Sequence, residues 1–310
     1  AVLPTCVLPS AFLLFAPAGI ADVRMGVGEV EVSGAVVDNL VQIVSPTLVY
    51  ANVSVSNARV VGAYTTMIGI NSTAVQMKTG GGVGGGGGGG EEQQQRLFLS
   101  VSSLVALSSP GITCISYTST SVEAEVEVVA EVSNVTTTAS TIAGVSIDAY
   151  SPFISANITL VDVRCEEGAP TLVNVEGVGG EVRMRDVTLS SPTLTSPLIR
   201  AIYSRPLSSL AIVLATFSMT GAVRASSTSA VIYLSGSCGL LFQPGVSFHF
   251  SMVADGPPLI QMVQTQSSSF FHSSSSFFSS PPSLSSLSST SPFPSLVAAT
   301  TTSSSTPSLS

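Results

Sequence analysis

The chain has 310 residues, of which only 9% are charged, compared with about 25% in an average globular domain. Its net charge is −8, and the ten Lys and Arg residues are scattered along the sequence. A nucleic-acid partner requires a clustered basic surface that neutralises phosphates, so the composition argues against that class of protein.

The abundance of Val, Ser, Thr, Ala and Gly, together with the absence of Trp, favours strands over helices. Val, Ile and Thr fit a pleated, half-buried surface and lose rotamer freedom in a helix. We therefore predict an all-β protein.

Residues 1–20 begin with an apolar region that contains the run AFLLFAPA from Ala11 to Ala18. A short apolar run that ends in Ala-x-Ala is typical of a secretory signal, but no basic segment precedes it. We expect residues 1–20 to be either a signal-peptide remnant or an N-terminal cap. No stretch of the sequence reaches the roughly 18 uninterrupted apolar residues of a spanning helix.

Short alternating runs recur from residue 21 to residue 266, and each predicts a half-buried strand because successive side chains point to opposite faces. The runs are Val30-Glu31-Val32, Val53-Ser54-Val55, Val126-Glu127-Val128, Ile158-Thr159-Leu160, Val182-Arg183-Met184 and Val246 to Phe250.

A second phrase, a small residue followed by Pro and apolar residues, punctuates the same region. It occurs twice in the stretch from Ser151 to Val187, at Pro152 and Pro170, and again at Pro197 and Pro258. Strands separated by loops of changing length, without tight hairpin turns, indicate a right-handed parallel β-helix. With about 25 residues per coil, the chain would form on the order of ten coils.

Two segments do not fit this pattern. Residues 79–95 (TGGGVGGGGGGGEEQQQ) offer few side chains for a core, so we interpret them as a flexible loop inserted at one turn, or as a linker between two β units. Residues 267–310 are rich in Ser, Thr and Pro, which is typical of a disordered or O-glycosylated tail.

Glycoside hydrolysis requires two carboxyl groups about 5 to 9.5 Å apart. Asp162 and Asp186 each close an alternating run, so they would stack on neighbouring coils and are the pair on which an enzymatic hypothesis would rest. We instead expect them to form a solvated row with Arg164, Arg183 and Arg185, and we predict no catalytic residues.

Other reactive side chains are also interpreted as structural. Glu123, Glu125 and Glu127 share one strand face, where they would hold Ca²⁺ or, as we prefer, discourage edge pairing. His249 occupies the polar side of a strand, and His272 belongs to the tail. No metal or other cofactor is predicted.

Four N-glycosylation motifs, at Asn52, Asn71, Asn134 and Asn157, favour an extracellular location. Cys6, Cys114, Cys165 and Cys238 are widely spaced and without metal-ligand spacing. They would form up to two disulfides in a secreted protein, or remain small buried side chains.

Segments such as TLVYANVSVSNARVVGAY, FISANITLVDVRC and VIYLSGSCGLLFQPG resemble pectin-lyase-like β-helix surface proteins and are similar in texture to the dispersed gene family of trypanosome-type surface proteins. The resemblance implies a membrane-associated, surface-exposed β-helix, attached through a segment outside this chain. We therefore expect a non-enzymatic adhesive or structural protein that binds glycans, extracellular proteins or host proteins. The alternative is a carbohydrate-active β-helix enzyme, active or degenerate.

Overall fold

The computed structural model describes residues 7–46, 48–72, 95–120, 125–149, 154–203, 209–225, 230–253 and 259–263. The chain divides into two units, Ala1–Ser267 and Ser268–Ser310, and all of the described residues belong to the first. The predicted tail and the predicted insertion, apart from Gln95, lie outside the described residues.

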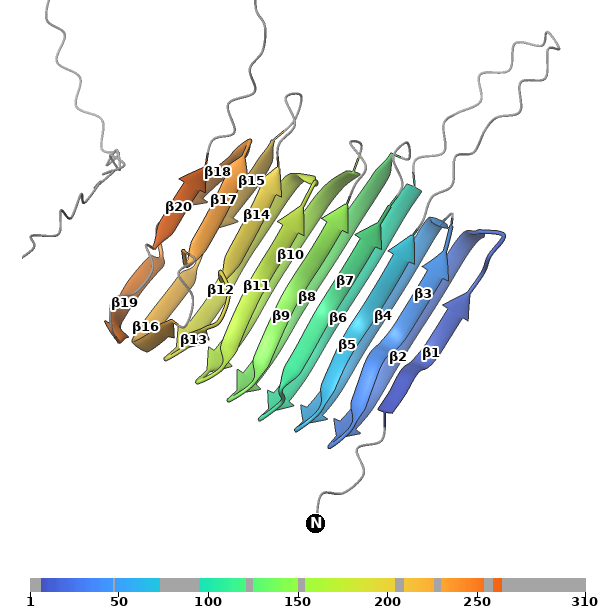
Figure 1. The fold of residues 1–310 in the computed structure, drawn as a ribbon, viewed down its shortest axis with the longest axis horizontal. Helices are drawn as coiled ribbons and strands as arrows, with labels where there is room; N and C mark the ends of the chain where they lie inside the picture. The colour runs from blue at the N-terminus through green and yellow to red at the C-terminus, as the bar shows by residue number, and fades with distance from the viewer. Residues whose placement is uncertain are drawn as a thin grey trace, which may run out of the picture. The chain divides into compact units, whose positions relative to one another are not determined.

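Two parallel sheets form this unit (Figure 1). Sheet A contains, in spatial order, β1 (Val7–Phe15), β3 (Val36–Ser45), β5 (Tyr64–Ser72), β7 (Gly111–Ser119), β9 (Thr141–Ala149), β11 (Ala169–Glu176), β14 (Ile199–Tyr203), β17 (Ile232–Gly236) and β20 (Ile260–Val263). Sheet B begins with β2 (Ile20–Ser33), β4 (Leu48–Val61), β6 (Gln95–Leu107), β8 (Val126–Thr138), β10 (Ile154–Glu166) and β12 (Gly179–Ser190). It is completed by β13 (Thr193–Leu194), β15 (Leu210–Leu214), β16 (Phe217–Ala225), β18 (Cys238–Phe242) and β19 (Val246–Val253).

Strands that follow one another in the sequence generally belong to opposite sheets, whereas every hydrogen-bonded neighbour comes from another coil. The fold is therefore a parallel β-solenoid of about seven turns, which confirms the predicted all-β parallel architecture. The predicted number of coils was too high. Register partners lie 28 residues apart at Val36 and Tyr64 and 30 apart at Ile112 and Ile142, so many coils consume more chain than the expected 25.

The stretch from Ser151 to Val187 spans one coil, so its two proline phrases are not two copies of a coil. The phrase at Pro152 precedes β10 of sheet B, whereas the phrase at Pro170 lies in β11 of sheet A, so the two mark different sides of the solenoid. The true coil repeat within this stretch joins β10 to β12, where Ile158 pairs with Val182.

Two columns of left-handed residues shape the coils. Residues of the first column have φ between 52° and 57° and bend each long sheet B strand, and we call this bend the first corner. Residues of the second column follow the last residue of that strand. The first column comprises Glu29, Asn57, Ser103, Asn134, Asp162 and Asp186. The second comprises Gly34, Gly62, Ser108, Ala139, Glu167 and Ser191, whereas Gly221, also left-handed, lies inside β16. One residue in the left-handed conformation turns the chain sharply. Because such a residue recurs at the same position of successive coils, the turns stack on one another.

The connections that lead from sheet A to sheet B differ in length from coil to coil. Residues 73–94, between β5 and β6 in the sequence, lie outside the described residues, and on either side of them β4 pairs with β6 and β5 pairs with β7. Both sheets therefore continue across the insertion. At the N-terminal end, β1 pairs with β3, so residues 7–15 of the predicted cap or signal remnant form a strand of sheet A.

The core lies between the sheets and is built from inward columns of apolar side chains. One column is Val53, Leu99, Ala130, Ile158, Val182 and Ile212, each at most 2% exposed. Because each coil covers the apolar face of its neighbour, burial is continuous along the stack.

Candidate binding faces

The structure brings the two predicted aspartates to equivalent positions on neighbouring coils. Asp162 and Asp186 lie between the paired residues Val161/Arg185 and Val163/Val187, and both adopt the left-handed conformation of the first corner. The predicted stacking of these residues is therefore present.

Each aspartate has an arginine partner on its own strand. The Arg164 Nη2 lies 3.0 Å from Asp162 Oδ1, and the Arg185 Nε lies 3.5 Å from Asp186 Oδ2. The aspartate side chains are 40% and 54% exposed, so water screens both pairs and each is worth about 0–1 kcal/mol. Arg164 and Arg185 therefore form the expected solvated pairs with the aspartates, whereas Arg183 pairs with Glu181 instead, at 2.7 Å.

The three predicted glutamates do not act as a group in the described structure. Glu123 lies outside the described residues, Glu125 is exposed just before β8, and Glu127 pairs with Arg96 of the neighbouring β6 at 3.2 Å. Within the described ranges, no three His, Cys, Asp or Glu side chains come close enough together to hold a metal ion.

His249 is exposed on β19, between the half-buried Phe248 and Phe250, as the alternating pattern predicts. Its register partner is Thr220 of β16. His272 lies outside the described residues.

The three described cysteines, Cys114, Cys165 and Cys238, are buried free thiols, and Cys6 lies outside the described residues. Burial, with a smaller contribution from the nearby Cys165, raises the pKa of Cys114 to about 12. Burial likewise raises the pKa of Cys165 to about 11, against the opposing effect of a hydrogen bond with Thr137. A thiol that holds its proton this strongly is a poor nucleophile, so these residues act as small core side chains.

All four sequon asparagines have exposed side chains. Asn52, Asn134 and Asn157 lie on the outer surface of sheet B, whereas Asn71 lies near the end of β5 in sheet A. Asn134 occupies the first corner, where its Nδ2 donates to the Ser103 Oγ of the preceding coil at 3.2 Å.

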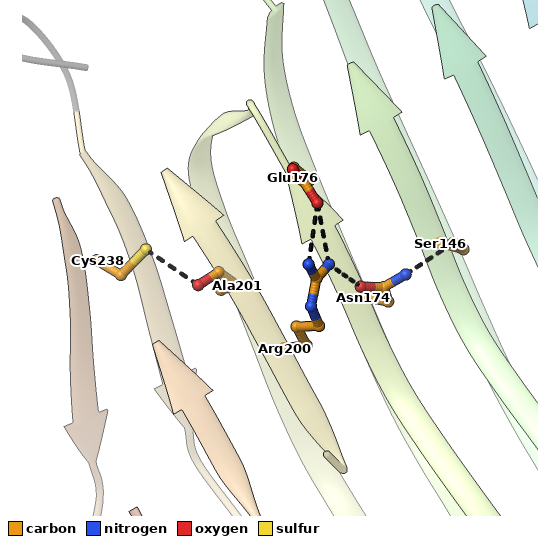
Figure 2. A network of polar contacts seen from close by, with 6 residues as sticks. All are labelled: Ser146, Asn174, Glu176, Arg200, Ala201 and Cys238. Carbon is orange, nitrogen blue, oxygen red and sulfur yellow. Dashed lines mark hydrogen bonds and ion pairs between the residues drawn. The ribbon is translucent and has the colours of Figure 1, made fainter. Parts of the chain in front are cut away.

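The outer surface of sheet A carries a connected group of polar side chains (Figure 2). We call Ser116, Ser146, Asn174, Arg200 and Tyr233 the polar row, because register places one of them on each of five successive strands. All five side chains are half-buried, so they form part of the sheet surface itself.

Hydrogen bonds join three members of the polar row. The Asn174 Nδ2 donates to Ser146 Oγ at 3.4 Å, and its Oδ1 accepts from Arg200 Nη1 at 2.9 Å. Arg200 also donates through both terminal nitrogens to Glu176 Oε2 at 3.1 Å. Both partners of Arg200 lie on β11, so these contacts fix the guanidinium against one neighbouring strand.

A shallow hollow of about 180 Å³ adjoins the start of the same strands. Its lining includes the side of Tyr64, which is 47% exposed, and the hydroxyl-bearing residues Thr113, Thr141 and Thr171. The Thr171 and Ser196 hydroxyls form a hydrogen bond of 2.5 Å at its margin. Sheet A therefore combines the polar row with a small hydroxyl-lined depression.

Comparison with protein-family models, curated proteins and solved structures found no match. No helix among the described residues is long and apolar enough to cross a membrane. The class that the fold defines is the parallel β-solenoid.

Proposed function

We propose that the protein is a non-enzymatic, extracellular or surface-displayed β-solenoid that binds glycans or proteins through the outer face of sheet A. The polar row carries this proposal. Its hydroxyl, amide and guanidinium groups repeat once per strand, at about 4.8 Å, so they match an extended ligand that offers hydrogen-bonding groups at regular intervals.

The distribution of the sequons supports the same choice of face. If all four asparagines carry glycans, three of these lie on sheet B and one, on Asn71, lies near the end of β5, outside the five strands of the polar row. An adhesive or structural protein of the pectin-lyase-like kind, or one like the trypanosome-type surface proteins, would expose its surface in this way, and membrane association through a further segment belongs to that proposal.

Binding to immobilised pectin, alginate and extracellular matrix proteins tests the proposal, with Asn174→Ala and Arg200→Ala as variants. Arg183→Ala is the matched control, because Arg183 also forms an exposed ion pair, at 2.7 Å with Glu181, but on sheet B. Binding that falls in both sheet A variants and persists in the control supports the proposal. Equal binding by all of the variants would assign recognition to another surface.

Glycosylation is tested separately by secretion from a eukaryotic host, followed by enzymatic removal of N-linked glycans. A loss of mass that decreases with each Asn→Gln substitution supports an extracellular protein. An unchanged mass in wild type would remove the argument for sheet A as the accessible face.

The alternative is a carbohydrate-active enzyme, and the stacking of Asp162 on Asp186 is the observation that favours it. Incubation with pectin and alginate would then release new reducing ends or unsaturated products. Product that disappears in both Asp162→Ala and Asp186→Ala would replace the proposed binding function with catalysis.

A further inference from the structure

Among the residues that the structure describes, core side chains are uncovered at both ends of sheet A. Phe12 of β1 continues the inward column of Val41 and Ile68, which are fully buried, yet Phe12 itself is 48% exposed. At the other end, Met262 of β20 continues the column of Leu234, which is 1% exposed, and is itself 58% exposed. Each end strand therefore presents apolar surface that a neighbouring coil covers elsewhere in the stack.

The outward positions of the end strands are apolar as well. Leu13 and Phe15 of β1 are 60% and 63% exposed, and Val263 of β20 is 37% exposed. The outward column that contains Val263 also contains Glu176, so apolar residues occur at the end of a column that is polar farther inside. Exposed edge strands are commonly protected by charges or by Pro; β1 contains Pro9, but neither β1 nor β20 contains a charged residue.

The two edges complement each other. All strands of sheet A are parallel, so the free edge of β20 presents the backbone groups that the free edge of β1 can pair with. Continuation of the register places Met262 beside Leu14 and Val263 beside Phe15. Exposed Phe15 would therefore meet exposed Val263, and exposed Met262 would meet the half-buried Leu14.

We propose that copies of this protein associate head to tail, with β20 of one copy pairing with β1 of the next. Sheet A carries the contact, because no described strand of sheet B lies beyond β19 at that end. The interface joins two different surfaces, so it does not close on itself as a twofold dimer does, and each added copy offers a new free edge.

Sedimentation velocity of the full 310-residue chain, over about two orders of magnitude in concentration, tests the proposal. The wild-type protein should pass from a 31.5 kDa monomer to species of at least twice that mass. Phe15→Lys and Met262→Lys should each remain monomeric. Val105→Lys is the control, because Val105 is 42% exposed in the middle of sheet B and its variant should associate as wild type does.

An equimolar mixture of the two monomeric variants gives the sharpest result. Phe15→Lys retains an intact β20 and Met262→Lys retains an intact β1, so the mixture should form a dimer and no larger species. A wild-type chain that remains monomeric, as expected if its own segments cover the ends, would overturn the proposal. So would association of either variant by itself, or loss of association in the control.

Discussion

Replacement of Gly62 by Ala isolates the energetic role of the left-handed corners. Gly62 has φ 56°, and an added Cβ would meet no atom within 4 Å, so the substitution changes backbone preference without a steric clash. The left-handed conformation costs a residue with a Cβ about 1–2 kcal/mol. Ala also restricts the unfolded chain more than Gly does, which stabilises the folded protein by about 0.4–1 kcal/mol. The substitution should therefore lower the free energy of unfolding by about 1 kcal/mol in total.

The matched control is Gly239→Ala. An added Cβ at Gly239 also meets nothing within 4 Å, and its φ lies outside the left-handed region, so only the gain of about 0.4–1 kcal/mol remains. Ala139, with φ 48° in the same column as Gly62, gives the reverse experiment, because Ala139→Gly should be stabilising. Urea denaturation followed by circular dichroism measures all three variants. Equal shifts for Gly62→Ala and Gly239→Ala would refute the reasoning.

Two further predictions concern the core. Leu104 is fully buried in β6, so Leu104→Ala should lower the free energy of unfolding by about 2–5 kcal/mol. The neighbouring Val105 is 42% exposed, so Val105→Ala should change it by no more than about 0.5 kcal/mol in the same denaturation assay. Cys114 and Cys165 should resist alkylation in the native protein and react after denaturation, which mass spectrometry of labelled peptides detects. Because burial raises their pKa from 9.0 to about 12 and about 11, the unfolded chain releases these protons first. Stability should therefore decline as the pH rises above 9, a trend that Cys114→Ala should weaken and that a flat profile in wild type would contradict.

Alternation in short runs was sufficient to predict the fold class and the orientation of many side chains. In Val182-Arg183-Met184, the two apolar residues are fully buried and the arginine is exposed, as the pattern requires. The period of two survives in the sequence because one face of each strand contacts the core and the other contacts water. The parallel stacking followed from the absence of hairpin turns.

The length of the coil was not accessible from the same patterns. Pro152 and Pro170 belong to similar phrases, although one precedes a strand of sheet B and the other lies in a strand of sheet A. The spacing between such phrases therefore does not give the length of a coil. The corners were equally hard to recognise, because residues as different as Glu29 and Ser103 adopt the same left-handed conformation. Position within the stack, rather than residue type, imposes that conformation.

The polar row was missed for a related reason. Ser146, Asn174 and Arg200 are separated by 28 and 26 residues in the sequence, and they belong to three chemical types, so no local motif connects them. A search at the true coil spacing would have aligned them. Asp162 and Asp186 were found because each follows a visible alternating run.

The stacking of coils across the glycine-rich segment is the central claim, and one distance tests it. Register places Ser54, Ser100, Glu131 and Thr159 in one outward column that spans β4, β6, β8 and β10. Three strand spacings separate the ends of this column, which predicts a backbone separation of about 14 Å between Ser54 and Thr159. Spin labels on Ser54→Cys and Thr159→Cys, in a Cys6→Ser background, measure it by electron paramagnetic resonance. A separation near 14 Å supports the continuous solenoid, and one far above about 20 Å would contradict it.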